Sequence, residues 1–409
     1  MTYKLIEIDK GIHYILDIPQ FKEDLPDNVY LDKVGTGTGF TTAVLQNNVD
    51  YVLALPFKAL GDNKLTQSKL SPEYKHELFM YHSGVENVEL RLKEYLERNK
   101  DKTKKIMVTY DSLPKLKSFI DFKDYKLAID EGHKLLEYAG NFKPKVINDL
   151  FEELYNFRAY IIATATPTRE EYIPIQLKNT EKIKLVWGDT TPVTFNHKRI
   201  AQSMLSDTLL SLALSFHRKE LEGNAYIFLN SVTDVVKIVK TLVNKFKLTS
   251  EDIKIICADS PTNVRKIATL GSGWKPKPVI EEDNPNKFYK INFITSTAFE
   301  GQDFLDSDGV TYIVSDGKLE HTKLDISTQV SQIVGRLRVS KYKDEVNMLW
   351  TCSPIGNYRT EEEYQVYIDE SRAEADLKMG DFNRMQSIDL KGKVVGILER
   401  YILHRYHRG

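Results

Sequence analysis

Cysteine is scarce in this chain: its 409 residues include only Cys257 and Cys352. Two cysteines cannot build a disulfide framework or a cysteine-rich zinc site, so both of these small-domain classes are excluded. The scarcity is typical of a reducing compartment, and we expect a cytoplasmic protein. The first residues carry no basic segment followed by a long apolar stretch, and no apolar run could span a bilayer. We therefore expect neither a secretion signal nor a membrane partner.

An excess of charge of either sign is also missing. Lys and Arg number 57 and Asp and Glu number 58, which leaves a formal net charge of −1. A global positive field is thus excluded, and any polyanion must be held in a local groove. Hydrophobic residues make up 41% and charged residues 28% of the chain, as in folded globular proteins. At about 150 residues per domain, the length predicts two to three domains.

Short apolar runs alternate with longer amphipathic stretches along the chain. The runs are rich in Ile, Val, Tyr and Ala and lack polar alternation, which is typical of strands buried on both faces of a parallel sheet. They are Tyr51–Leu55, Ile106–Thr109, Lys126–Ile129, Ala159–Ala163, Ala225–Leu229, Lys254–Cys257, Ile291–Ile294 and Val310–Val314. The stretches with helical spacing are Val88–Asn99, Val146–Tyr155, Ala201–Leu214 and Val232–Phe246. The pattern predicts an α/β fold.

The alternation is interrupted near the middle of the chain, at Lys182–Asn196. Residues 187–192 break the periodicity there, and a helical pattern starts at about Lys198. Residues 271–287 are rich in Gly and Pro and predict an exposed insertion. The predicted parts are a first parallel-sheet domain (1–185), a second one (186–360) and a charged helical C-terminal extension (361–409).

A glycine-rich segment, KVGTGTGFTT at residues 33–42, lies between a first apolar strand and a helical pattern. Its glycines let the backbone turn tightly with inward-pointing N–H groups, as in the Walker A loops that bind nucleotide phosphates. Thr41 or Thr42 would supply the hydroxyl that helps to hold Mg²⁺. Phe40 stands where the Walker pattern requires lysine, so this loop alone is a weak signal. The predicted phosphate-binding residues are Gly35, Thr36, Gly37, Thr38, Gly39, Phe40, Thr41 and Thr42.

Two adjacent carboxylates end a buried strand. The sequence LAIDEGH at residues 127–133 runs from an apolar segment directly into Asp130, Glu131 and His133. Adjacent acids also begin many helices as ordinary N-terminal charges. At the carboxyl end of a central parallel strand, however, they suit the hydrolysis of a Mg²⁺–nucleotide, with Asp130 on the metal and Glu131 polarising the attacking water. We favour this functional interpretation.

With the glycine loop and the DEGH segment in this order, the chain resembles the core of superfamily 2 helicases of the DEAD/DEAH type, which has two tandem RecA-like domains. Further segments resemble motifs of that family in the family's order: Ala54–Leu60 (Ia), Val108–Leu113 (Ib), Ala163–Thr168 (III), Ile227–Ser231 (IV), Ile294–Asp303 (V) and Gln332–Arg338 (VI). Each short match has a false-positive risk, but the ordered set is specific. The wording TGTGFTT and TSTAFEGQD resembles helicase-like proteins of phages and mobile elements, including origin-binding-protein-like ones, more than cellular RNA helicases.

The resemblance implies a role for each matching residue. ATP and Mg²⁺ would be the cofactors, with the nucleotide bound by the glycine loop, Gly301 and Asp303, and the metal held by Thr41 and Asp130. The implied catalytic residues are Asp130, Glu131, Gln332, Arg336 and Arg338. The implied coupling residues are His133, Thr164 and Thr166. The implied nucleic-acid contacts are Pro56, Lys58, Thr109, Ser112, Ser231, Thr295 and Ser296.

Simpler roles compete with some of these assignments. Arg336 and Arg338 could be solvated charges at a surface corner, and Arg338 lies one residue short of the family's spacing. His133 could be an ordinary polar residue at a helix start, and Pro56 could pack after a strand.

The resemblance implies an ATP-dependent helicase or translocase acting on single-stranded or partly duplex nucleic acid. DNA is favoured over RNA, and replication proteins are the expected further partners. The main alternative is a nucleic-acid-binding scaffold on the same fold that has lost catalysis through Phe40. Another P-loop NTPase, such as a kinase or a partitioning ATPase, is disfavoured because the second half carries its own arginine motif.

Phe40 leaves one positive charge to be supplied from elsewhere. Lys33, at the end of the strand before Gly35, is the nearest candidate, and we hypothesise that it neutralises the phosphates together with Arg336. The competing interpretation of Lys33 is a solvated lysine at a strand end. On the first hypothesis, Phe40→Lys should strengthen nucleotide binding.

Overall fold

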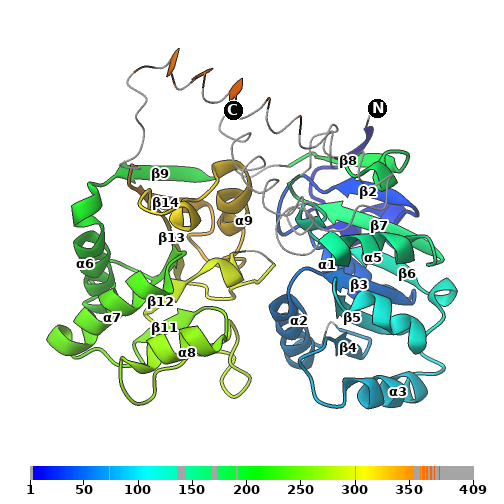
Figure 1. Ribbon diagram of the computed structural model, residues 1–409, viewed down its shortest axis with the longest axis horizontal. Coiled ribbons are helices and arrows are strands. Elements are labelled where there is room, and N and C mark those ends of the chain that lie inside the picture. Colours follow the sequence, from blue (N-terminus) through cyan, green and yellow to red (C-terminus); the bar gives the residue numbers. More distant parts are fainter. Residues whose placement is uncertain are drawn as a thin grey trace. The chain divides into compact units, whose positions relative to one another are not determined.

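The computed structural model describes residues 3–72, 74–135, 144–166, 173–189, 192–299 and 301–352, together with a few residues between 360 and 377 (Figure 1). These residues form two compact units that divide near residue 190. Each unit is built around one sheet, and the strand pairs of the described residues are all parallel. The predicted α/β fold with two parallel-sheet domains is confirmed. The extension expected at 361–409 lies almost wholly outside the described residues.

The first unit holds an eight-stranded sheet in the order β1-β8-β2-β7-β6-β3-β5-β4. Its strands are β1 (Lys4–Ile8), β2 (Val29–Asp32), β3 (Tyr51–Leu55), β4 (Leu78–Tyr81), β5 (Lys105–Thr109), β6 (Lys126–Ile129), β7 (Ala159–Thr164) and β8 (Glu181–Trp187). Because the strands are parallel, their carboxyl ends share one edge of the sheet. The loops that follow β2, β7 and β6 are therefore neighbours at that edge.

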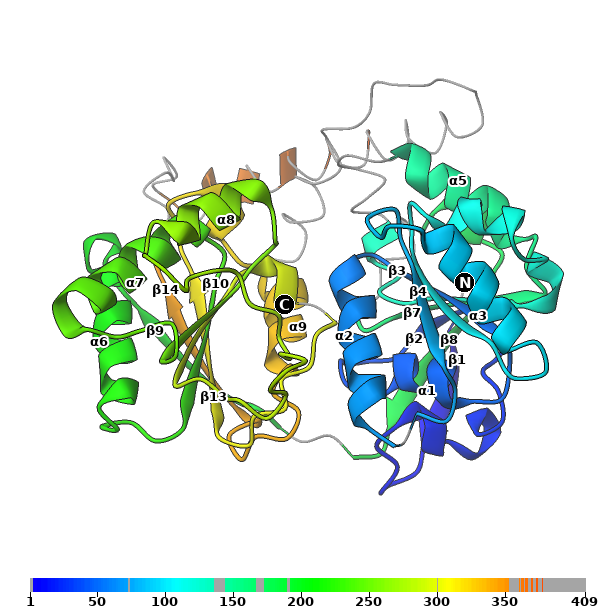
Figure 2. The ribbon, with the colours of Figure 1, turned by 90° about the horizontal axis from the view of Figure 1, so that it is seen from below.

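Helices cover both faces of this sheet (Figure 2). They are α1 (Phe40–Gln46), α2 (Lys58–Leu70), α3 (Val88–Arg98) and α5 (Pro144–Leu154). In α3, Val88, Leu92 and Tyr95 recur at helical spacing and are buried. None of the described helices is both long and apolar enough to cross a membrane.

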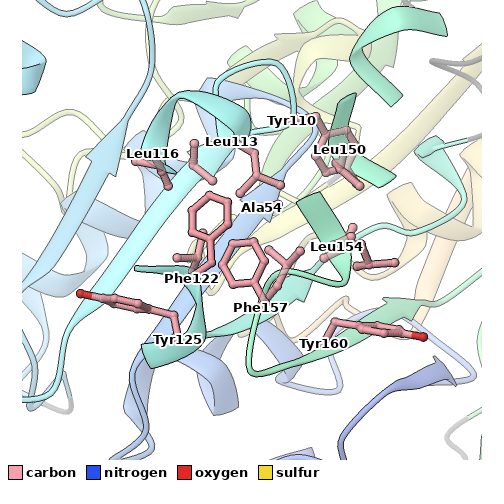
Figure 3. Packing of buried hydrophobic residues seen from close by; sticks show 14 of the residues in the cluster. Ala54, Tyr110, Leu113, Leu116, Phe122, Tyr125, Leu150, Leu154, Phe157 and Tyr160 are labelled. Carbon is pink, nitrogen blue, oxygen red and sulfur yellow. The ribbon is translucent and has the colours of Figure 1, made fainter. Parts of the chain in front are cut away.

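Two hydrophobic cores lie on the two faces of the first sheet, and successive residues of β3 contribute to them in turn. Val52 packs in the core that contains α3 and α5, whereas Leu53 packs in the core that contains α1 and α2. Figure 3 shows part of the first core, where the rings of Phe122 and Phe157 stack with their centroids 4.1 Å apart. Burial on both faces explains why the apolar runs of the sequence do not alternate with polar residues.

The second unit holds a six-stranded sheet in the order β11-β12-β10-β13-β14-β9. Its strands are β9 (Thr194–Arg199), β10 (Asn224–Leu229), β11 (Ile253–Ile256), β12 (Ile291–Ile294), β13 (Gly309–Ser315) and β14 (Glu345–Trp350). Its helices are α6 (Leu205–His217), α7 (Val232–Phe246), α8 (Pro261–Ala268) and α9 (Ser331–Val334), the last following a π-helical turn at Ile326–Val330. Residues 271–287 contain no helix or strand, as expected for an insertion.

The junction between the units differs from the sequence prediction. The boundary expected at 185/186 falls within β8, which pairs with β1 and β2 in the first sheet. The helical pattern expected from about Lys198 is wrong, because Lys198 lies in β9 and α6 begins at Leu205. All of β9 is exposed at the sheet edge, so it has no buried apolar run that would indicate a strand.

Candidate active site

The loops after β2 and β6 are both hydrogen-bonded to the last residues of β7, at the carboxyl edge of the first sheet. The Lys33 N–H donates to the Thr164 carbonyl at 2.9 Å, and the Gly132 N–H donates to the Ala163 carbonyl at 2.8 Å. A Cβ on Gly132 would lie 2.6 Å from the Ile162 side chain, so this position requires glycine. The glycine loop, the DEGH segment and the start of the predicted motif III are thus held together.

The glycine loop turns through left-handed backbone conformations. Gly35, Gly37 and Gly39 have φ values of 143°, 81° and 78°, which glycine adopts without steric cost. Val34 has a φ of 51°, which is strained for a β-branched residue. Its N–H donates to the Asp32 carboxylate at 2.9 Å, and this bond holds the turn. Residues 35–39, including Thr36 and Thr38, are half-buried.

Phe40 is the first residue of α1, and its ring is only 2% exposed. It belongs to the hydrophobic core formed with α1 and α2. A lysine at this position would have to desolvate its ammonium in apolar surroundings. The structure therefore argues against the expectation that Phe40→Lys strengthens nucleotide binding.

Lys33 is buried at the carboxyl end of β2, with 6% of the residue exposed. Its Nζ lies 2.9 Å from Asp130 Oδ1, 3.8 Å from Glu131 Oε1 and 5.6 Å from the centroid of the Phe40 ring. The Trp187 indole N–H donates to the Lys33 carbonyl at 3.0 Å, which fixes the main chain as well. The interpretation of Lys33 as a solvated strand-end lysine is wrong, because both its ammonium and its main chain are held within the unit.

Asp130 joins the glycine loop to the acidic pair. The Thr41 hydroxyl donates to Asp130 Oδ2 at 2.5 Å, while Lys33 occupies Oδ1. Burial alone would raise the pKa of Asp130, but the Lys33 ammonium and the Thr41 hydroxyl favour the charged form, and the pKa lies below its ordinary value of 3.8. Asp130 is therefore a carboxylate at neutral pH. Thr42, the alternative hydroxyl donor, is half-buried.

These two oxygen ligands fit the chemistry of Mg²⁺. A threonine hydroxyl and a carboxylate are hard donors, and Mg²⁺ is commonly held by one or two such groups together with substrate phosphates. Among the described residues, no cluster of three His, Cys, Asp or Glu side chains is placed to hold a metal ion by itself. A hydroxyl and a carboxylate, as Thr41 and Asp130 supply them, suit a metal that also binds nucleotide phosphates.

Glu131 has a left-handed backbone, with a φ of 56°, and only 3% of the residue is exposed. The Nδ1 of His133 lies 3.5 Å from Glu131 Oε2 and 3.1 Å from the Thr164 hydroxyl. That hydroxyl in turn donates to the Thr166 carbonyl at 3.0 Å. The three predicted coupling residues therefore form one connected chain that starts at Glu131. Pro167 and Thr168, the end of the predicted motif III, lie outside the described residues.

The two arginines of the predicted motif VI form hydrogen bonds within the second unit. Arg336 is only 2% exposed, and its guanidinium donates to the carbonyl and the side-chain oxygen of Gln332 at 2.7 and 2.8 Å. The solvated interpretation of Arg336 is therefore wrong. Arg338 is partly exposed and its Nε donates to Asp303 Oδ1 at 2.7 Å. This bond joins the predicted motif V to the predicted motif VI within the unit. Gly301, two residues before Asp303, has a φ of 69°.

The predicted nucleic-acid contacts differ in exposure. In the first unit Lys58 is exposed and Pro56 is buried. Thr109 donates its hydroxyl to Ser112 Oγ at 3.0 Å, and Ser112 is fully buried. Ser112 thus supports its own loop, which argues against a direct contact between its side chain and a strand.

The predicted contacts of the second unit lie at the carboxyl ends of β10 and β12. Ser231 caps α7 by accepting the Asp234 N–H, and Thr295 is buried. Ser296 is exposed, and its N–H donates to the Asn230 side chain at 3.2 Å. A contact with nucleic acid at these positions stays a prediction.

Sequence reasoning missed two residues that organise the site. Trp187 holds the Lys33 carbonyl, and Tyr110 donates its hydroxyl to the Asp130 carbonyl at 2.6 Å. The sequence prediction puts Trp187 in the break between domains and gives Tyr110, inside the predicted motif Ib, no role of its own. The one signal in the sequence is an aromatic residue with a polar tip near a motif, and many ordinary packing residues share it.

Comparison with known proteins supports the fold. No protein-family model and no curated protein matches this chain. The solved structure of the DEAD-box helicase Mss116 bound to ssRNA and AMP-PNP is 14% identical, with a TM-score of 0.54, over 94% of this chain and 89% of that chain. S. cerevisiae Dbp5 bound to RNA and ADP BeF3 is 13% identical, with a TM-score of 0.51, over 84% of this chain and 82% of that chain. At such low identity the likeness shows the fold alone, which is two tandem RecA-like domains.

Proposed function

We propose that this chain is an ATPase that couples hydrolysis to action on single-stranded or partly duplex nucleic acid. One observation carries the proposal: the buried side chains of Lys33, Asp130 and Glu131 and the half-buried Thr41 form a connected cluster beside the glycine loop. The cluster combines a positive charge, two hard oxygen ligands and a second carboxylate. These are the groups that phosphoryl transfer to water requires.

The residues of the cluster divide the work. The half-buried backbone of the glycine loop surrounds the phosphates, and Lys33 supplies the positive charge that Phe40 cannot. Thr41 and Asp130 hold Mg²⁺, which when bound neutralises charge on the phosphate oxygens. Glu131 orients the attacking water and accepts its proton. Arg336, Arg338, Gln332, Gly301 and Asp303 keep their proposed roles on the nucleotide.

The nucleic-acid part of the proposal is supported by the fold. The similar structures named above hold RNA, as their descriptions state. The sequence favours DNA and a kinship with phage and mobile-element helicases, and replication proteins as partners. These finer assignments stay predictions, and a direct comparison of single-stranded RNA with single-stranded DNA decides the first of them.

The test is ATP hydrolysis by the purified full chain, with and without single-stranded RNA or DNA. We expect hydrolysis that rises when one of the strands is added. Glu131→Gln should keep nucleotide binding and lower turnover by about 10²–10⁴-fold, because it removes the base and preserves the shape.

Glu153→Gln is the matched control. Glu153, in α5, is also buried, with 8% exposed, and its carboxylate lies 2.8 Å from Lys117 Nζ, outside the cluster of Lys33, Asp130 and Glu131. Loss of turnover in both variants would point to a general loss of structure. Full turnover in Glu131→Gln would contradict the assignment of the base.

A second candidate, a non-hydrolysing scaffold, is favoured by the burial of Phe40 in the core. A chain that binds single strands tightly and does not hydrolyse ATP at any strand concentration would establish it.

A further inference from the structure

Tyr110 links two places that the proposed function keeps separate. It directly follows β5, and it is fully buried in the core that contains α3 and α5. Its hydroxyl donates to the Asp130 carbonyl at 2.6 Å and lies 3.4 Å from the Glu131 carbonyl. One phenol thus reaches the main chain of both carboxylate residues.

The peptide that Tyr110 holds is the strained one. Glu131 has a left-handed backbone, which is strained for a residue with a Cβ and persists only where the surrounding structure enforces it. The Glu131 N–H also donates to Asp130 Oδ1 at 2.9 Å, and the Asp130 N–H donates to the Ala54 carbonyl at 3.2 Å. Because the Tyr110 hydroxyl fixes the carbonyl side of the same turn, it sets the direction in which the Glu131 side chain leaves the strand.

The main chain of Tyr110 lies in the loops predicted to contact nucleic acid. Its N–H donates to the Leu55 carbonyl at 3.1 Å, immediately before Pro56. Its neighbours Thr109 and Ser112 are joined by their hydroxyls. A displacement of the loop after β3 or of the loop after β5 would therefore move the backbone of Tyr110. Because the Tyr110 ring is rigid, its hydroxyl would move with the backbone and shift the Asp130–Glu131 main chain.

We propose that Tyr110 is a positioning residue through which a strand bound at the loops after β3 and β5 aligns Glu131 for hydrolysis. The proposal rests on the proposed function, because it assigns a route for stimulation of the ATPase by nucleic acid. Tyr110 contacts neither strand nor nucleotide in this role. It acts through the Asp130–Glu131 main chain.

The test compares Tyr110→Phe with Tyr95→Phe. Tyr95 is an equally buried tyrosine whose hydroxyl bonds to main chain, receiving the Lys105 N–H at 2.7 Å and lying 3.1 Å from the Glu77 carbonyl. Both variants keep the ring and lose one buried hydroxyl, so both should lower the melting temperature by a similar amount. The measured quantities are kcat and KM for ATP with and without saturating strand, and the affinity for the strand by fluorescence anisotropy.

We expect Tyr110→Phe to lower the strand-stimulated kcat by about ten- to hundredfold, with unchanged KM for ATP and unchanged strand affinity. Tyr95→Phe should retain full stimulation. The proposal is overturned if Tyr110→Phe is stimulated as strongly as the parent, or if both variants lose stimulation equally. A parent chain without any strand-stimulated hydrolysis would contradict the proposed function itself, and this outcome is seen before a variant is examined.

Discussion

Buried lysines occur at both ends of the sheet of the first unit, but they hold different partners. At the amino end of β6, the ammonium of Lys126 donates to the Leu25 carbonyl at 2.7 Å and pairs with Asp24 at 2.8 Å. Lys105 lies near the same Tyr51 ring as Lys126. The Nζ atom of Lys126 is 5.5 Å and that of Lys105 is 5.0 Å from the ring centroid. Lys126 and Lys105 thus stabilise the packing of the neighbouring loops against the amino end of the sheet.

Lys126 also pairs with Asp27, but both of its carboxylate partners are partly or largely exposed. At the carboxyl end, Lys33 pairs with two adjacent carboxylates that are buried, beside a half-buried glycine loop. The backbone there is left-handed at Val34 and Glu131, where side chains carry a steric cost. The carboxyl end thus combines a buried ion-pair cluster with left-handed residues that carry a steric cost, whereas at the amino end the carboxylates are exposed to solvent and Asn28 tolerates its left-handed backbone. This difference is expected where one end serves function and the other serves stability. The comparison teaches that burial of a lysine does not by itself identify its role.

The largest expected effect separates the core from the site. Phe40→Lys replaces a buried ring of the hydrophobic core, so we expect a loss of unfolding free energy of about 3–5 kcal/mol, as for deletion of a core aromatic side chain. It should not strengthen ATP binding. Urea unfolding and isothermal titration measure both. A stable variant with tighter ATP binding would show that position 40 can reach the phosphates.

The next effect isolates the amino end. Lys126→Met removes the ammonium that holds the Leu25 carbonyl and Asp24, and we expect a loss of about 2 kcal/mol, discounted because the carboxylate is partly exposed. ATP affinity should not change in the folded variant. If the free energy of ATP binding changed by more than the free energy of unfolding, the proposed separation between a stabilising amino end and a functional carboxyl end of the sheet would be wrong.

The pH dependence of stability should also trace to the amino end. Burial lowers the pKa of Lys105 to about 7, from an ordinary value of 10.5, although its ammonium is close to the Val44 and Val49 carbonyls. Above pH 7 the unfolded chain binds more protons at this lysine than the folded chain, so stability rises with pH by at most about 1.4 kcal/mol per unit. Urea midpoints between pH 7 and 9 should therefore rise more in the parent than in Lys105→Met. Parallel slopes would contradict this.

The smallest effect concerns the strain at the carboxyl end. Val34→Gly should stabilise the chain by about 1 kcal/mol, because glycine adopts a φ of 51° freely. Asn28 has a similar φ of 54° at the amino end of β2, but asparagine tolerates it, so Asn28→Gly should give no gain. Thermal unfolding compares the two variants. Equal shifts in melting temperature for the two variants would show that the backbone of Val34 is no more strained than that of Asn28.

Much of the fold could be predicted from the sequence, since strands buried on both faces leave long apolar runs. The bounds of β3, β6 and α7 agree with the sequence prediction. The exposed edge strand β9 left no such signal. Within the site, the order of the motifs predicted that Thr41 and Asp130 would meet.

The environments of Lys33, Phe40 and Tyr110 could not be predicted, because they depend on which way a side chain turns at the end of a strand or the start of a helix. A lysine that follows a strand has the same sequence context whether its ammonium is solvated or paired with two carboxylates. Only the packing of α1 and the neighbouring loops decides between these states.

The most direct test of the central claim is the affinity for a non-hydrolysable ATP analogue with Mg²⁺, measured by isothermal titration for the parent, Lys33→Met, Lys33→Arg and Lys126→Met. If Lys33 replaces the missing Walker lysine, Lys33→Met should bind at least about tenfold more weakly. Lys33→Arg should retain part of the affinity, and Lys126→Met should bind like the parent. A folded Lys33→Met that binds the analogue as tightly as the parent would contradict the account.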